Sequence, residues 1–382
     1  MKKKICAITG SRADYGIYHP VFRAIKGSRH LELYIVATCM HLMREFGYTA
    51  REIEKDGFRI YRKADISYGE DTAVAMSVSV GKAVILLSKI FAELRPDVVM
   101  VLGDRGEMLS GAIAANYLNI PVAHIHGGEV SGHVDGLLRH AITKLAHIHL
   151  APTKGSGERI IRMGEEPWRV HVVGAPALDR IINGRFSPRA KLIKRYKIDP
   201  TSPLILAVQH PVSTEIGKAA SHMKIMLDAV RETGVQTIVA YPNADAGGRR
   251  MIEVIRSYKR YPFIKAFKSI PHEDYLGLMK IASVLVGNSS SGIIEAPSFG
   301  LPVVNIGARQ HGRERSPNII DVRCVKGEIV NAVKKAMSDS AFRKGAARHR
   351  NLYGDGNAAK RIVSLLEDIK IGDRLLHKRI TY

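Results

Sequence analysis

Residues 97–126 read DVVMVLGDRGEMLSGAIAANYLNIPVAHIH, and this stretch decides the fold. It contains a short apolar run that ends at Gly103, a helical pattern over Glu107–Tyr117, and a second apolar run at Val122–His126. Short, continuously apolar runs that are rich in Val and Ile indicate parallel strands covered on both faces. A strand, a helix and another strand in this order predict a right-handed βαβ unit of a doubly wound sheet.

The same alternation extends in both directions from this stretch. In the first half of the chain, further strands are predicted at Lys4–Thr9, Leu31–Thr38, Phe58–Tyr61, His147–Ala151 and Val170–Val173. Residues 184–203 interrupt the rhythm with three prolines among many cations, which is typical of a domain linker. After this linker, strands are predicted at Leu204–Gln209, Gln236–Ala240, Phe263–Ala266, Val284–Val286 and Val303–Ile306. We therefore predict an α/β fold with two Rossmann-like domains, residues 1–183 and 184–356, that face each other across a cleft.

The charge balance is strongly basic. The 382 residues include 58 Lys and Arg against 36 Asp and Glu, a formal net charge of +22. Such an excess suits nucleic acid, an anionic surface or an anionic small substrate. The cations are spread thinly, and the chain has neither zinc-finger spacing nor an aromatic RNA-binding signature. We therefore expect no nucleic-acid partner, and interpret the charge as a solvated basic surface that also attracts phosphates.

The cysteines and the apolar stretches bear on location. Cys6, Cys39 and Cys324 lie far apart, which suits reduced thiols in a cytosolic protein. We expect that no apolar stretch reaches the ~18 residues that span a bilayer. The apolar run after Lys4 is also too short for a signal peptide. We expect a cytoplasmic protein that does not enter a membrane.

Polar residues at strand ends are the first functional candidates, because ligands of open parallel sheets bind beyond the carboxyl ends of the strands. The turn at Gly10–Gly16 could present backbone N–H groups and Arg12 to an anion, or could be only structural. It matches neither a dinucleotide-binding nor a Walker A motif. Asp104 beside Arg105 could be a functional carboxylate, or a cap for the helix that begins near Glu107.

Three more strand ends carry polar groups. His124 and His126 share one face of their predicted strand, but the spacing to further ligands matches no standard zinc pattern, so we expect no metal. His210 ends a strand and could face the cleft, although a lone histidine there is more often structural. The serines of 287–292 precede a helix predicted at Ile293–Phe299 and could cradle a phosphate, while Glu295 could bind ribose hydroxyls.

In their order along the chain, these strings resemble the UDP-N-acetylglucosamine 2-epimerases, particularly the hydrolysing branch that supplies N-acetylmannosamine. The resemblance rests on Ser11-Arg12-Ala13-Asp14-Tyr15, Gly103-Asp104-Arg105, the string from His124 to Gly132, the string from Arg139 to Lys144, Gln209-His210-Pro211, Gly287-Asn288-Ser289-Ser290, Gly307-Ala308-Arg309-Gln310 and Gly312-Arg313-Glu314. Each string alone is weak, but the ordered series covers most of the chain.

The resemblance implies a fold like that of B-type glycosyltransferases, with a final helix of about 357–382 that packs back on the first domain. It implies hydrolysis of UDP-N-acetylglucosamine to N-acetylmannosamine and UDP through 2-acetamidoglucal, without a cofactor, in a homo-oligomer (dimer or tetramer). Three alternatives stay open: the same reaction on a UDP-2,4-diacetamido-2,4,6-trideoxyhexose, a non-hydrolysing 2-epimerase, and a UDP-sugar glycosyltransferase.

The resemblance also implies roles for individual residues. The expected catalytic residues are Asp104, Asp135, His126, Glu129, His210 and Arg139. The expected substrate-binding residues are Arg12, Asp14, His41, Arg105, Asn243, Ser289, Ser290, Glu295 and Arg309. Sialic-acid-type members carry a glutamate where this chain has His126, so either His126 or Glu129 takes the acid/base role.

Overall fold

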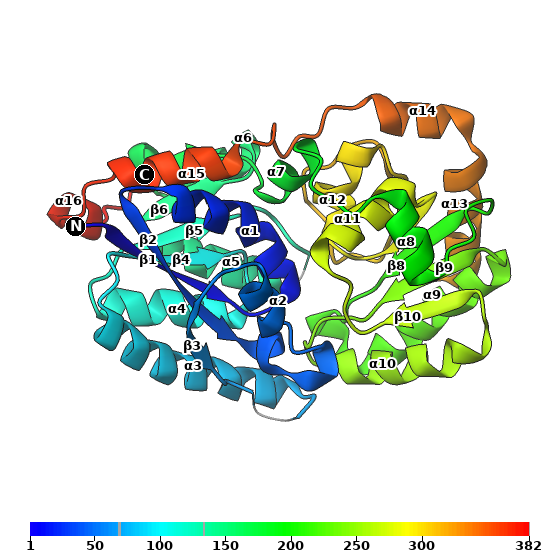
Figure 1. Ribbon diagram of the computed structural model, residues 1–382, viewed down its shortest axis with the longest axis horizontal. Helices are drawn as coiled ribbons and strands as arrows, with labels where there is room; N and C mark the ends of the chain where they lie inside the picture. Colours follow the sequence, from blue (N-terminus) through cyan, green and yellow to red (C-terminus); the bar gives the residue numbers. More distant parts are fainter. Residues whose placement is uncertain (68–69, 133, 382) are drawn as a thin grey trace. The chain divides into compact units, whose positions relative to one another are not determined.

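The computed structural model describes residues 1–67, 70–132 and 134–381. It divides the chain into two compact units. Unit 1 consists of Met1–Glu129, Val134–Arg180 and Tyr353–Tyr382, and unit 2 of Val130–His133 and Ile181–Leu352. Each unit is built on one parallel sheet with helices on both faces (Figure 1), which confirms the predicted class of two Rossmann-like domains.

The sheet of unit 1 has seven strands in the order β3-β2-β1-β4-β5-β6-β7. They are β1 (Lys3–Thr9), β2 (Leu31–Thr38), β3 (Ile60–Ala64), β4 (Val98–Leu102), β5 (Val122–Ile125), β6 (Ile148–Ala151) and β7 (Val170–Val172). The third strand therefore begins two residues later than predicted, because Phe58 packs into the core instead. The strand order reverses between β1 and β4, and such a switch point is where doubly wound sheets bind ligands.

Helices cover both faces of this sheet. On one face α1 (Arg12–Gly27) packs against α15 (Ala358–Asp368), and on the other α4 (Gly106–Tyr117) lies between α3 (Ala73–Leu94) and α5 (Val134–Leu145). Each face has its own cluster of buried aliphatic and aromatic side chains. The remaining helices are α2 (Ala50–Lys55), α6 (Lys154–Arg162), α7 (Ala177–Ile182), α16 (Asp373–Leu376) and the 3-10 turns η1 (Cys39–Leu42), η2 (Arg44–Phe46) and η3 (Pro167–Arg169).

Helix α3 corrects one expectation about apolar stretches. By length and composition it could cross a membrane, with a mean hydropathy of 1.7 over an 18-residue window. Lys82 and Lys89 divide the helix into shorter uncharged runs in the sequence. In the fold, Leu87 and Phe91 pack in the core of unit 1, while Ile85 and other apolar side chains of the outer face stay exposed.

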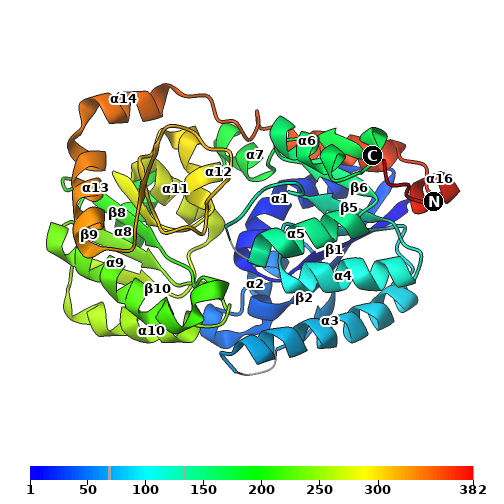
Figure 2. The same ribbon diagram turned by 180° about the vertical axis from the view of Figure 1, so that it is seen from behind.

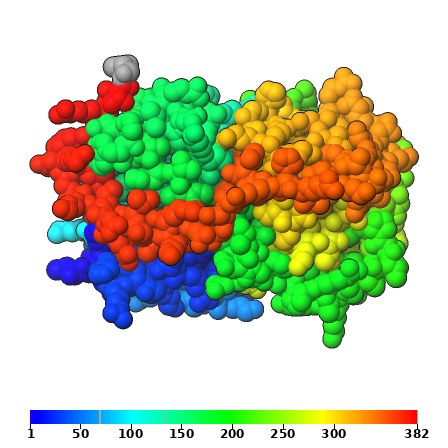
Figure 3. Space-filling view, turned by 90° about the horizontal axis from the view of Figure 1, so that it is seen from above, coloured from blue at the N-terminus to red at the C-terminus, as the bar shows by residue number. Residues whose placement is uncertain are grey.

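The C-terminal segment is fastened to unit 1 by side chains from far away in the sequence. Asp179 accepts hydrogen bonds from the backbone N–H groups of Ala358 and Ala359, at 3.0 and 2.7 Å, and so caps the first turn of α15. At its other end Lys3 Nζ donates to the carbonyls of Glu367 (2.6 Å) and of two neighbouring residues, Leu366 and Ile369. Figure 3 shows this red segment between the blue N-terminal part of unit 1 and the green part that contains α6.

The sheet of unit 2 has six strands in the order β10-β9-β8-β11-β12-β13. They are β8 (Leu204–Val208), β9 (Gln236–Ala240), β10 (Ile264–Phe267), β11 (Val284–Gly287), β12 (Val303–Ile306) and β13 (Ile319–Val322). The sequence did not predict β13, an edge strand with only partly buried side chains. The switch point of this sheet lies between β8 and β11.

Helices also cover both faces of the second sheet. Figure 2 shows α9 (Ala219–Thr233) and α10 (Gly248–Ser257) on one side of the strands, and α11 (His272–Ile281) and α12 (Ser291–Ile294) on the other. The remaining helices are α8 (Arg189–Tyr196), α13 (Lys326–Ser338), α14 (Ser340–Arg348) and the 3-10 turns η4 (Ser213–Lys218), η5 (Tyr258–Arg260) and η6 (Ala296–Phe299).

The cap on α15 gives a stability prediction. Asp179→Ala removes the acceptor of two buried N–H groups, so the free energy of unfolding should fall by about 1–2 kcal/mol. Urea denaturation followed by circular dichroism measures this. Asp368→Ala, an exposed substitution at the far end of the same helix, serves as the control and should change it by less than about 0.5 kcal/mol. Equal losses in the two variants would contradict the capping role.

Candidate active site

The carboxyl ends of β4 and β5 bring three of the expected catalytic residues together. Arg139 of α5 is 1% exposed, and its Nη2 pairs with the Asp104 carboxylate that follows β4. Its Nη1 donates to the backbone carbonyl of Glu129, in the loop after β5, at 3.2 Å. Asp135 lies in the first turn of α5, four residues before Arg139 and therefore on the same helix face. A buried guanidinium thus joins two loops and a helix.

His126 and Glu129 form a second buried pair in the same unit. His126 Nδ1 lies 3.0 Å from Glu129 Oε2, and both side chains are 4% exposed. A carboxylate only accepts, so Nδ1 carries the proton. Among the described residues, His126 Nε2 is buried without a hydrogen-bond partner. The pair has the arrangement of an imidazole acid/base group oriented by a carboxylate.

The backbone at His126 corrects the expectation that it shares a strand face with His124. Strand β5 ends at Ile125, and His126 has φ +63°, in the left-handed region that residues other than glycine rarely adopt. This turn takes the side chain of His126 out of the strand alternation. Left-handed residues of this kind concentrate at functional sites, where the surrounding structure holds them.

A third group of charges lies where β1 and β4 end. Arg105 Nε donates to Glu107 Oε1 at 2.8 Å, and the Glu107 side chain is 4% exposed. Asp14 accepts the Gly10 N–H at 3.2 Å, and donates its own N–H to Ser11, the N-cap of α1, at 3.2 Å. Burial raises the pKa of Asp14 to about 6; the positive charge of Arg105 opposes this rise and the negative charge of Glu107 adds to it.

Two residues of this unit that are expected to bind substrate, Arg12 and His41, differ in position and in burial. Arg12 is the first residue of α1, at the strand-end edge of the sheet. His41 is fully buried, and its two ring nitrogens bond to Thr9 at 3.0 Å and Thr49 at 2.8 Å. Burial also lowers the pKa of His41 to about 3, which keeps it neutral. Both ring nitrogens of His41 therefore bond within the core, and its role in substrate binding stays a prediction.

In unit 2, His210 is fixed with a defined tautomer. Its Nδ1 accepts the backbone N–H of Asn243 at 3.1 Å, so Nε2 carries the proton of the neutral ring and is a donor. Its backbone is clamped by fully buried Asn288, which accepts the His210 N–H at 2.7 Å and donates to the His210 carbonyl at 2.9 Å. Arg309 Nη1 and Gln310 Nε2 donate to the Asn288 carbonyl at 3.2 and 2.8 Å. Asn288 and Gln310 are positioning residues that sequence reasoning did not single out, although both lie in its matching strings.

The serine-rich loop differs from its prediction. The helix expected at Ile293–Phe299 is split into α12 and the 3-10 turn η6, because Pro297 cannot continue an α-helix. A four-residue helix has little dipole, so any anion binding here must rely on hydroxyl and N–H donors. Ser291 contacts the Ser289 hydroxyl at 2.9 Å and Tyr275 at 2.6 Å, while Ser289 and Ser290 are half-buried and Glu295 is buried.

Metal coordination has no candidate in the described parts of the chain. Across residues 1–67, 70–132 and 134–381, no group of three His, Cys, Asp or Glu side chains is placed to hold a metal ion.

The chain is similar to known proteins over nearly its whole length. The sequence profile described as UDP-N-acetylglucosamine 2-epimerase matches residues 23–367. The UDP-N,N'-diacetylbacillosamine 2-epimerase (hydrolyzing) of Legionella pneumophila is 39% identical over 382 residues, 100% of both chains. The UDP-N-acetylglucosamine 2-epimerase of Neisseria meningitidis serogroup B is 35% identical over 341 residues, 89% of both chains. The GDP/UDP-N,N'-diacetylbacillosamine 2-epimerase (hydrolyzing) of Campylobacter jejuni is 34% identical and covers 99% of this chain and 98% of that one.

Solved structures share the fold. Staphylococcus aureus MnaA in complex with UDP has a TM-score of 0.80 at 21% identity and 96% coverage of each chain. The Neisseria meningitidis UDP-GlcNAc 2-epimerase bound to UDP-GlcNAc also has a TM-score of 0.80, at 18% identity, over 95% of this chain and 99% of that one.

Asp14 gives a pH prediction. Its pKa is 3.8 when unperturbed and about 6 in the fold. A raised pKa means that the folded state holds the proton more tightly, so the stability that Asp14 contributes is lost as pH rises from about 4 to about 6. Over this range the wild type should lose up to about 3 kcal/mol relative to Asp14→Asn, which does not titrate. Urea denaturation of both proteins from pH 4 to about pH 7 tests this; parallel stability curves would contradict it.

Proposed function

This chain belongs to the UDP-N-acetylglucosamine 2-epimerase family, and we propose that it is a hydrolysing 2-epimerase, which converts a UDP-linked N-acetylhexosamine and water into UDP and the free sugar inverted at carbon 2. The observation that carries the proposal is two pairs of oriented side chains in unit 1. Half-buried Asp104 pairs with buried Arg139, and His126 pairs with Glu129, both buried. A glycosyltransferase that transfers a sugar from UDP to an acceptor has no need of both.

We propose that unit 2 binds UDP. As the bond between C1 of the sugar and the phosphate oxygen breaks, UDP leaves with the electron pair, and its negative charge must be met by fixed donors. His210 Nε2–H, the Arg309 guanidinium and the Ser290 hydroxyl are donors of this kind. Asn288 supports two of them, because it holds the backbone of His210 and accepts from Arg309. We propose that Arg12 of unit 1 adds a further positive charge.

The groups of unit 1 then act on carbon 2. In the first step a base takes the C2 proton while UDP departs from C1, which leaves 2-acetamidoglucal. In the second step a proton returns to C2 from the opposite face and water adds to C1. Opposite faces require two separate acid/base groups. We assign Asp104, which pairs with Arg139, as the base, and His126 Nε2 as the group that returns the proton.

Glu129 and Asp135 complete this scheme. Glu129 accepts from His126 Nδ1 and stabilises the positive charge of the ring when it holds two protons. We therefore propose that the imidazole and Glu129 act together where sialic-acid-type members carry a single glutamate. Asp135 is proposed to take the proton of the water that attacks C1. No cofactor enters any of these steps.

Two substrates are candidates. UDP-N-acetylglucosamine follows from the resemblance of the sequence motifs. UDP-N,N'-diacetylbacillosamine, a 2,4-diacetamido sugar nucleotide, appears in the names of the Legionella and Campylobacter relatives. We favour the diacetamido substrate, because the Legionella relative matches the full length of both chains at 39% identity. Either substrate undergoes the same proton transfers at C2.

We also propose that the protein works in the cytoplasm as a homo-oligomer. The free cysteines support the location. The exposed apolar side chains on the outer face of α3, such as Val74 (68% exposed) and Ile85 (59%), support self-association with a second copy. Light scattering coupled to size-exclusion chromatography measures the mass; a monomer at micromolar concentration would contradict the proposal.

The reaction is tested by incubating the enzyme with each UDP-sugar in deuterated water. Nuclear magnetic resonance should show free UDP and a free 2-epimeric sugar that carries one deuterium at C2, because the returning proton exchanges with solvent. We expect the larger kcat/KM with UDP-N,N'-diacetylbacillosamine. A product that stays attached to UDP would identify a non-hydrolysing epimerase, and retention of the C2 proton would refute the elimination.

Substitutions in unit 1 should lower catalysis, whereas substitutions in unit 2 should weaken UDP binding. Asp104→Asn and His126→Gln should each lower kcat by about 100-fold or more, the usual contribution of a general acid or base. UDP affinity, measured by calorimetry, should stay within about twofold, because these residues do not bind the nucleotide. Ser290→Ala is the converse variant and should weaken UDP binding by about tenfold through the loss of one phosphate hydrogen bond. Loss of UDP affinity in Asp104→Asn would move Asp104 out of the catalytic role.

A further inference from the structure

We propose that His124 is a positioning residue, a buried imidazole that holds the segments carrying Asp104, His126 and Arg139 in their catalytic arrangement. The inference rests on the proposed function and assigns a role to a side chain that none of the proposed chemical steps uses. His124 lies in β5, directly beneath the loops that follow β4 and β5. It is fully buried, so it acts on the reaction only through its neighbours.

The first contact fixes the loop of Asp104. His124 Nε2 lies 2.7 Å from the backbone carbonyl of Gly103, the residue before Asp104. Because a carbonyl only accepts, Nε2 carries the proton and donates it to this bond. Gly103 has φ +71°, a left-handed turn that sends the chain from β4 into the Asp104 loop. The hydrogen bond therefore fixes the turn from which the Asp104 carboxylate projects.

The second contact concerns the loop of His126. A side-chain carbon added at Gly127 would lie 2.9 Å from His124 Nδ1, closer than carbon and nitrogen atoms approach without a shift. The His124 ring thus packs directly against the backbone of Gly127, the residue after His126. This contact supports the loop from below at the place where His126 takes its left-handed conformation.

The third contact reaches the helix of Arg139. The Thr143 hydroxyl lies 3.4 Å from His124 Nδ1 and 3.0 Å from the Arg139 carbonyl, one turn earlier in α5. One imidazole therefore touches a chain neighbour of Asp104, a chain neighbour of His126 and the turn of helix that carries Arg139. Burial lowers the pKa of His124 to about 3, so the ring stays neutral and keeps this tautomer at physiological pH.

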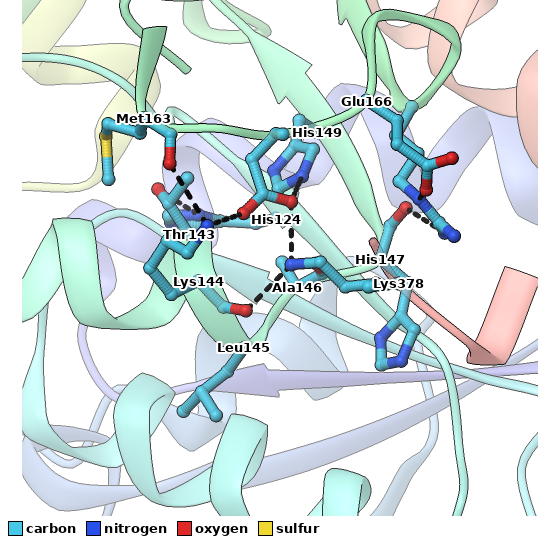
Figure 4. Close-up of polar contacts among 12 residues, drawn as sticks. His124, Thr143, Lys144, Leu145, Ala146, His147, His149, Met163, Glu166 and Lys378 are labelled. Carbon is cyan, nitrogen blue, oxygen red and sulfur yellow. Dashed lines mark hydrogen bonds and ion pairs between the residues drawn. The ribbon is translucent and has the colours of Figure 1, made fainter. Parts of the chain in front are cut away.

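A rigid polar cluster lies next to His124. In the parallel sheet His124 is paired in register with His149 of β6, which places both side chains on one face of the sheet. His149 Nε2 lies 3.0 Å from Glu165, a buried carboxylate that also pairs with Lys144 at 2.6 Å and Lys378 at 2.7 Å. Figure 4 shows His124, Thr143 and His149 among these contacts. The cluster connects α5, β6 and the C-terminal segment, and so provides rigid support next to the His124 ring.

The test compares substitutions that keep or remove the donor. Gln at 124 can place its amide N–H near the position of Nε2, whereas Leu of similar volume cannot donate at all. His124→Leu should lower kcat by about 100-fold with KM and UDP affinity within about threefold, since misplacement of catalytic groups by about 1 Å costs this much. His124→Gln should stay within about tenfold of the wild-type kcat. His19→Gln, at another buried histidine of unit 1, should leave both constants unchanged.

Hydrogen exchange of peptides that cover residues 103–107 and 126–129 measures the order of these loops independently of enzyme activity. Exchange should be faster in His124→Leu than in the wild type and near the wild-type rate in His124→Gln. If His124→Leu fails to fold, His124→Asn replaces it, because its shorter amide cannot reach Gly103. The proposal is overturned if the donor-deficient variant keeps wild-type kcat and exchange, or if His124→Gln loses as much as His124→Leu. A wild-type enzyme that releases no sugar would instead refute the proposed function, and the exchange result would still decide the role of His124.

Discussion

Desolvation of charge is the constraint on which unit 1 depends. A charged group that leaves water must find a partner inside the protein, because the penalty for an isolated buried ion is several kcal/mol. Arg139, at 1% exposed, meets this requirement with the Asp104 carboxylate and the Glu129 carbonyl. Glu129 in turn bonds to His126. Since each group satisfies another, the strand ends can hold several ionisable side chains close together in a fixed geometry.

In both units, a neutral buried side chain bonds to the backbone of the loop that carries the proposed functional residues. In unit 1 the His124 ring bonds to the Gly103 carbonyl, and in unit 2 the Asn288 amide bonds to both backbone groups of His210. Both side chains are fully buried. Asn288 directly follows β11, which flanks the switch point of its sheet, and His124 lies in β5, one strand beyond the switch point of its own. A neutral, fully bonded side chain can be buried at low cost, so it can order a loop without a charge that the substrate would disturb.

In the proposed mechanism, the imidazole at position 126 organises proton transfer differently from a lone carboxylate. A histidine needs a partner that selects its tautomer and stabilises its charged form, and Glu129 supplies both from three residues away. The left-handed backbone of His126, with Gly127 packed on His124, makes this pairing possible in a short loop. A glutamate at the same position would need no such orienting carboxylate, although it would lie beside Glu129 and be repelled by it.

The sequence by itself determined the α/β class, two parallel sheets, most strands and the family, because apolar runs and strand-end motifs are local signals that do not depend on distant contacts. It also named Asp104 and Glu129, which follow predicted strands, and Arg139, which lies inside a predicted helix and whose role the resemblance to the family implied. Only the tertiary structure decided which of these groups contact one another and that His126 leaves the strand. It also decided that both ring nitrogens of His41 bond to threonines, and that one face of α3 packs in the core. The edge strand β13 was missed for a related reason, whereas the split at Pro297 could have been predicted, because a proline inside a helical segment is a local signal. Burial, the sign of φ at a residue and hydrogen-bond partners depend on residues far apart in the chain, and no local sequence pattern records them.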